Sequence, residues 1–100
     1  MKAKEYTNKL IEFCEGHEDP ESVSINASRI LILFLKEGKE LAKSRNAKSN
    51  EAGIAILKEQ SDKWRAFANN VNKHFNLPVI KPTGYKDFVI SEYPELKGRF

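Results

Sequence analysis

Cysteine and histidine side chains lie close together at one place in the chain. Cys14 and His17 are separated by two residues, which is the spacing of a zinc half-site, and acidic residues follow directly. A structural zinc site needs four protein ligands, and the only other histidine is His74. No spacing indicates the missing ligand. We therefore expect no bound metal, with Cys14 in the core and His17 in solvent.

Nucleophilic catalysis would need a thiol or hydroxyl beside a base, and Cys14 with His74 is the only Cys–His pair that folding could bring together from a distance. Cys14 lies on an apolar stripe, where a thiol usually behaves as a small hydrophobe. The sequence has no nucleophile elbow, phosphate loop or glycine-rich turn. Acidic pairs such as Glu59 and Asp62 have the spacing of a solvated helix face. We expect neither catalysis nor a cofactor.

A second group of chemically active residues is basic. Four bases share one edge of a predicted helix over residues 20–45, with a repeat of seven: Arg29, Lys36, Lys39 and Lys43. In line, these charges are able to neutralise the phosphates of a nucleic acid. However, no aromatic stacking platform or helix-turn-helix spacing accompanies them. Ile25 and Ile32 occupy the same arc, which suits a partner helix better than a phosphate backbone.

Composition and charge narrow the class of protein. The 100 residues are 40% hydrophobic and 31% charged, which is typical of one globular domain and not of a disordered chain. The 17 Lys and Arg exceed the 14 Asp and Glu by a net charge of +3, less than a dedicated nucleic-acid arm carries. The single cysteine excludes an intrachain disulfide. We expect one domain over residues 1–100.

The location of the protein is predicted from the absence of apolar segments. The longest apolar run covers only residues 30–35, whereas a membrane span needs about 20 residues. The Lys-rich start lacks the apolar segment of a signal peptide. We therefore expect a cytoplasmic protein that is not inserted in a membrane.

Two long helices must hold these side chains. Apolar residues recur at three- and four-residue steps over 20–45, with Asp19 as N-cap, and again up to residue 75, after a cap at Ser49 or Asn50. The second of these helices carries a heptad seam. A short loop joins them, so we expect an antiparallel hairpin in which the Trp64 side chain lies near Leu31 and Phe34.

Shorter elements complete the expected all-α fold. An amphipathic helix is predicted over 2–15, and two prolines keep the 77–84 stretch extended as a strap. A short helix follows over 85–96, with an end or kink near Glu92 because of Pro94. The N-terminal helix, the strap and the last helix are expected to pack on the hairpin.

The apolar run 30–35 leads to a prediction of function. A β-strand is the competing interpretation, but helix-forming residues flank the run and turn residues are missing. As a helix it is apolar in every direction, and an exposed Ile or Leu forgoes about 1.5–3 kcal/mol. Either the rest of the chain covers it, or a partner does. The residues most suited to a shared surface are Ile32, Leu35, Ile56 and Phe67.

The sequence therefore predicts a small non-catalytic interaction protein. It would present an apolar helix face either to a second copy, forming a homo-oligomer and most simply a dimer, or to another protein. The alternative is a small nucleic-acid-associated regulator that uses the four bases of the second helix on phosphates.

Overall fold

The computed structural model describes residues 2–46, 50–76, 78 and 80–99. The chain forms α1 (Ala3–Phe13), α2 (Pro20–Ser44), α3 (Asn50–Phe75), α4 (Gly84–Glu92) and a 3-10 turn, η1 (Pro94–Leu96). No strand occurs among the described residues. The all-α prediction is confirmed, and the alternative of a strand over residues 30–35 is excluded because these residues belong to α2.

Local sequence explains where α2 begins. The Asp19 carboxylate accepts a hydrogen bond from the Ser22 backbone N–H at 3.1 Å, and Pro20 occupies the first helical turn. Hydrogen bonds from Ser22 hold the pKa of the Asp19 carboxyl below its usual value. The predicted N-cap is therefore confirmed. The caps predicted for the next helix, Ser49 and the side chain of Asn50, lie outside the part of the chain that the structure describes.

The ends of α1 and α3 depend on residues with left-handed backbone. Gly16 has a φ of +80° after α1, and Asn76 has a φ of +54° directly after α3. Glycine and asparagine are the residue types that adopt this conformation at the lowest steric cost. α3 stops at its signal, whereas α1 ends at Phe13, three residues before Gly16 and two residues earlier than the predicted end at Glu15.

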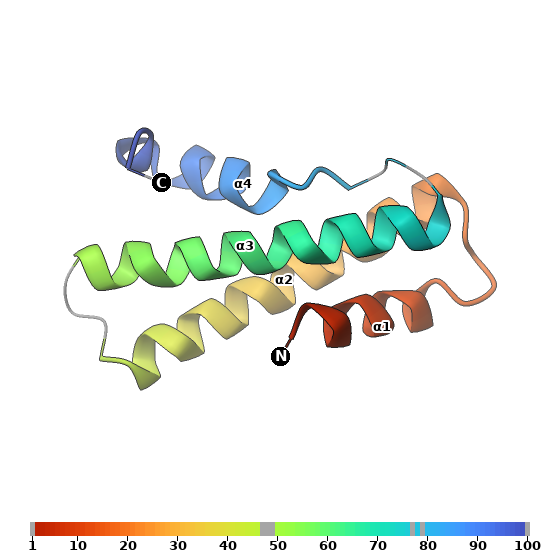
Figure 1. The fold of residues 1–100 in the computed structure, drawn as a ribbon, viewed down its shortest axis with the longest axis horizontal. Helices are drawn as coiled ribbons and strands as arrows, with labels where there is room; N and C mark the ends of the chain where they lie inside the picture. Colours follow the sequence, from red (N-terminus) through yellow and green to blue (C-terminus); the bar gives the residue numbers. More distant parts are fainter. Residues whose placement is uncertain (1, 47–49, 77, 79, 100) are drawn as a thin grey trace.

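The helices pack into an elongated molecule with dimensions of 44 × 26 × 17 Å (Figure 1). α2 and α3 run in opposite directions along the long axis and contact each other (Figure 1). α1 contacts both long helices, whereas α4 contacts α3 from the other side. α3 is therefore covered by three other helices, and α2 is left with a side that faces no other element.

Phe34 of α2 is at the centre of the core. The Tyr6 ring from α1 stacks on it with centroids 4.3 Å apart, and the Trp64 ring meets it edge-on at 5.2 Å. Phe67 and Tyr85 add tilted ring contacts from α3 and α4, at 5.9 and 6.1 Å. Such pairs contribute about 0.5–1.5 kcal/mol each beyond their burial. The predicted contact between Trp64 and Phe34 is confirmed.

The segment between α3 and α4 is attached to α3 by side-chain hydrogen bonds. The Asn72 side chain donates to the Ile80 carbonyl at 2.7 Å and accepts from the Ile80 N–H at 3.1 Å. The Trp64 indole N–H donates to the Lys81 carbonyl at 3.1 Å. A Cβ at Gly84 would lie only 3.1 Å from that indole nitrogen, so the start of α4 packs closely on Trp64. Positions 77 and 79 of the predicted strap lie outside the described residues.

Candidate functional site

The cysteine and histidine residues do not form a reactive site. Cys14 is fully buried, and the Asn26 amide donates to its Sγ at 3.4 Å. His17 and His74 are both exposed, and His74 packs edge-on against the Phe75 ring. Over the described ranges, no group of three His, Cys, Asp or Glu side chains is placed to hold a metal ion.

A half-buried ionic cluster connects the first three helices. Lys63 of α3 donates to Glu37 Oε1 at 2.6 Å, and the Tyr6 hydroxyl of α1 donates to Glu37 Oε2. Burial alone would raise the pKa of Glu37, but the hydrogen bonds from Lys63 and Tyr6 lower it below its usual value. Burial, together with the hydrogen bond to Glu37, raises the pKa of Tyr6. A carboxylate that is engaged in this way is a structural group and not a free general base.

Sequence reasoning missed this cluster, although a signal was present. Glu37 lies three residues after Phe34 and seven after Ile30, so it belongs to the core stripe of α2 by position. Acidic side chains usually lie in solvent, so the residue type concealed this inward position. Its inward position, together with the lysine at 63 on the facing helix, is what a buried ion pair requires.

Gln60 is a second buried polar group. Its amide donates to the Phe34 carbonyl at 2.9 Å, whereas its Oε1 has no hydrogen-bond partner among the described residues. A Cβ at Gly38 would lie within 3.8 Å of Gln60 and within 3.6 Å of the Tyr85 hydroxyl. These are ordinary van der Waals distances, so side chains of α3 and α4 lie close to the backbone of α2 at this position.

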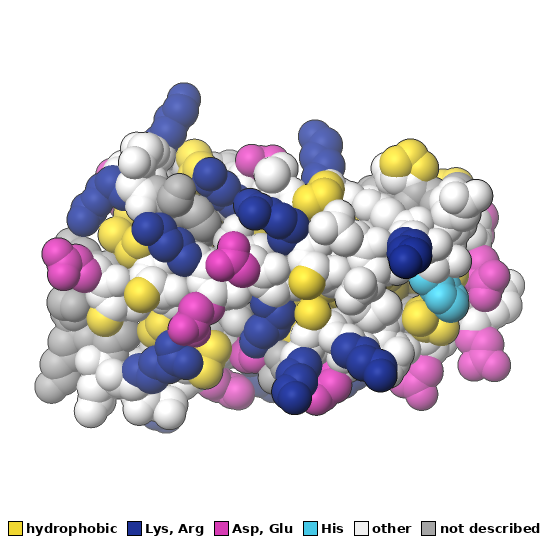
Figure 2. All heavy atoms as spheres, viewed as in Figure 1, with side chains coloured by type: hydrophobic (Ala, Val, Ile, Leu, Met, Phe, Trp, Pro, Cys, Tyr) yellow, Lys and Arg dark blue, Asp and Glu magenta, His cyan; other side chains and the backbone are white. Residues whose placement is uncertain are grey.

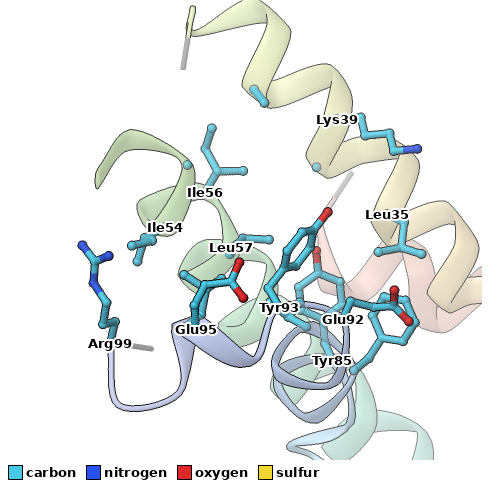
Figure 3. A pocket seen from close by; sticks show the side chains of 16 residues that line it. Leu35, Lys39, Ile54, Ile56, Leu57, Tyr85, Glu92, Tyr93, Glu95 and Arg99 are labelled. Atoms are coloured by element: carbon cyan, nitrogen blue, oxygen red, sulfur yellow. The ribbon is translucent and has the colours of Figure 1, made fainter. Parts of the chain in front are cut away.

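A groove of about 700 Å³ opens between the C-terminal half of α2, the N-terminal half of α3, and α4 with the segment after it (Figure 3). Leu35 and Ile56 line it from the two long helices, and Tyr93 lines it from the opposite wall. Four charged residues also line it, two basic and two acidic: Lys39, Arg99, Glu92 and Glu95. Because these charges balance, the groove favours neither an anion nor a cation.

The side of α2 that faces no other element carries a continuous stripe of exposed residues. We call it the outer face of α2, and it consists of Glu21, Ile25, Ser28, Arg29, Ile32, Lys36, Lys39 and Lys43, of which Lys39 also lines the edge of the groove. From residue 25 to residue 43 its main members are alternately four and three residues apart, which is the spacing of a helix–helix seam. Ile25 is 55% exposed and Ile32 is 64% exposed.

The bases of the outer face have no counter-charges. Arg29, Lys36, Lys39 and Lys43 are all exposed, and none forms an ion pair or a side-chain hydrogen bond in the described part of the chain. By contrast, Arg45 just beyond α2 pairs with Glu59 of α3 at 2.8 Å. Figure 2 shows Lys and Arg side chains at many places on the face that it presents, so charge alone does not single out a surface there. Exposed isoleucines among unpaired bases distinguish the outer face.

The four residues predicted for a shared surface are not brought together. Ile32 lies on the outer face, whereas Leu35 and Ile56 line the groove. Phe67 is 0% exposed, with its ring against Phe34 and Trp64. α3 is covered on more than one side, so its second apolar flank points into the core. We therefore leave Phe67 out of any surface considered below, and Ile56 is buried beneath the groove.

No family model, curated protein or solved structure matches this chain. No helix within the described ranges has the length and apolar character needed to cross a membrane. The function must therefore be inferred from the surfaces of the molecule itself.

Proposed function

We propose that this is a non-catalytic, cytoplasmic interaction protein that binds a protein partner through the outer face of α2. In this proposal, α2 and α3 act as a rigid antiparallel hairpin. α1 and α3 cover the inner side of α2 and leave its outer face exposed. The observation that carries the proposal is the exposure of Ile25 and Ile32 at 55% and 64%, one heptad apart on a single stripe.

Chance exposure is a poor explanation for this stripe. Single exposed hydrophobic residues are common on monomers, and they need no partner. Two isoleucines at i and i+7 on one helix face are instead the arrangement that helix–helix contacts use. Isoleucine is also a weaker helix former than the Lys, Glu or Ala that serve on solvated faces. The choice of residue is therefore explained by contact with another helix rather than by folding.

A nucleic acid is the second candidate partner. The specific observation in its favour is that the four bases of the outer face are exposed and lack counter-charges in the described residues. From Arg29 to Lys43 they extend about 21 Å along α2, enough to meet several phosphates. The two isoleucines have no role in phosphate contact, so we rank this candidate below a protein partner.

The test is site-specific photo-crosslinking in the cells that produce the protein. A photo-reactive phenylalanine replaces Ile32 on the outer face or, as a matched control, the exposed Arg65 of α3. We expect discrete protein adducts from position 32, few from position 65, and a marked loss from position 32 when Ile25→Asp is added. Equal adducts from the two positions, or adducts only with nucleic acid, would overturn the proposal.

A further inference from the structure

We infer that the partner is a second copy of this chain, and that two outer faces of α2 pair antiparallel about a two-fold axis between residues 28 and 29. This inference rests on the proposed function, because it uses the same face. It adds the identity of the partner, the direction of the pairing and its register.

The direction follows from the distribution of charge along α2. The start of the helix is acidic, with Glu21 on the outer face and Glu18 and Asp19 just before it. The later half of the outer face is basic and carries Lys36, Lys39 and Lys43. Antiparallel pairing places the acidic end of each copy against the basic end of the other, whereas parallel pairing places like charges together. Only the antiparallel arrangement is electrostatically complementary.

The register follows from the isoleucines. When Ile25 lies opposite Ile32 of the second copy, Glu21 lies opposite Lys36 of the second copy, because both pairs are centred between residues 28 and 29. The same alignment sets Lys39 opposite Glu18. The two-fold symmetry repeats each contact, so four isoleucines form an apolar centre flanked by ion pairs on both sides. A shift of one heptad in either direction leaves one isoleucine of each copy opposite a charged residue.

Ser28 and Arg29 lie at the two-fold axis, and the charge of Arg29 distinguishes self-pairing from binding to another partner. Ser28 is small and lets the two helices approach closely. Arg29, on the other side of the stripe, lies next to its own equivalent, and the two guanidinium groups repel each other. Removal of this charge should therefore strengthen self-association. Removal of the same charge would weaken binding to a nucleic acid or to an acidic protein.

The pairing should be weak and sensitive to salt. The paired part of α2, from Glu21 to Lys36, extends about 23 Å along each helix, or about four turns, and involves one helix per copy. Interfaces of this small size belong to transient complexes, and their ion pairs are screened by salt. We expect a dissociation constant in the micromolar range at low salt.

The experiment is sedimentation equilibrium from low to high micromolar protein on wild type and charge variants. Glu21→Lys and Lys36→Glu should each weaken association about tenfold, since each replaces two attractive contacts with two repulsive ones. The double variant Glu21→Lys/Lys36→Glu should recover wild-type affinity within about threefold, because it exchanges the partners of each pair. Arg29→Ala should associate more tightly than wild type. Lys43→Glu, which carries the same charge change beyond the paired segment, is the control and should leave association unchanged.

Three results would overturn the inference: a monomer at every concentration, no recovery in the double variant, or equal losses in Lys36→Glu and Lys43→Glu. Thermal unfolding checks that each variant is folded. Recovery of self-association in the double variant is a second check, because two substitutions that each unfolded the protein would not restore its association. A monomeric wild type whose position 32 still crosslinks to a different protein would refute self-pairing and leave the proposed function standing. A dimer that none of these variants affects would also refute self-pairing through this face, and crosslinking from position 32 would then decide the proposed function.

Discussion

The two sides of α2 carry similar side chains in different settings. On the inner side, Phe34 is fully buried among aromatic rings, and Glu37 receives hydrogen bonds from Lys63 and Tyr6. On the outer side, Ile32 is mostly exposed, and Lys36 has no ion-pair partner among the described residues. The comparison teaches that one helix can hold the fold together with one face and keep apolar and charged groups available on the other.

The largest expected effect comes from truncation on the inner side. Phe34→Ala should lower the free energy of unfolding by about 3–5 kcal/mol, because it empties the centre of the aromatic cluster. Ile32→Ala, two residues away on the outer face, should change it by less than about 0.5 kcal/mol in dilute solution. Urea unfolding of both variants measures the difference. Similar losses for the two would show that the faces do not differ in the way described.

The ionic cluster of Glu37, Lys63 and Tyr6 tests whether a paired charge on α2 contributes more to stability than an exposed one. Glu37→Gln should reduce stability at neutral pH by about 1–3 kcal/mol, because it leaves Lys63 half-buried without its counter-charge. Glu40→Gln, at an exposed position of α2, is the control and should have little effect. Urea unfolding at neutral pH compares the two variants.

The loss of stability in Glu37→Gln should depend on pH in a defined direction. Because the pKa of Glu37 is lowered in the folded protein, the carboxylate stabilises the fold above its unfolded value of 4.5. This stabilisation disappears as the pH falls through the folded value. The stability difference between wild type and Glu37→Gln should therefore be constant near neutrality and shrink below about pH 4.5. A difference that is independent of pH would argue against an ionised Glu37 in the cluster.

A smaller effect is expected where the strap meets α3. Asn72→Ala removes both side-chain hydrogen bonds to the backbone of Ile80, and it should cost about 1–2 kcal/mol. Hydrogen exchange of the Ile80 N–H should speed up by more than the global loss of stability accounts for. Asn69→Ala, at an exposed site on the same helix, is the control. Equal exchange at Ile80 in the two variants would show that Asn72 does not hold the strap.

The spacing of the apolar residues predicted the helices well, because the burial of one helix face imposes steps of three and four residues directly. The limits of α2 and the contact between Phe34 and Trp64 follow from three- and four-residue steps that any amphipathic helix shows. The end of α1 was less well predicted, since a glycine at position 16 signals a stop without fixing the last turn. The inward position of Glu37 was readable from its spacing, but its residue type concealed it.

The surfaces were harder to predict than the helices. Phe67 was predicted for a shared surface, but its exposure depends on how many neighbours cover α3, which a single-helix pattern does not contain. The groove depends on the relative position of α4 and the two long helices, so no local pattern predicts it. Ile32 is exposed, as its position opposite the core stripe indicates, because such a stripe is defined within one helix. Its role in a shared surface stays a prediction.

The central claim is that the outer face of α2 is not used for folding. The most direct test is the double variant Ile25→Gln/Ile32→Gln, compared with wild type by urea unfolding in dilute solution and by sedimentation at high concentration. We predict an unfolding free energy within about 1 kcal/mol of wild type, together with a loss of self-association. A loss of stability of several kcal/mol in the dilute monomer would show that the face is covered within one chain, and it would contradict the account.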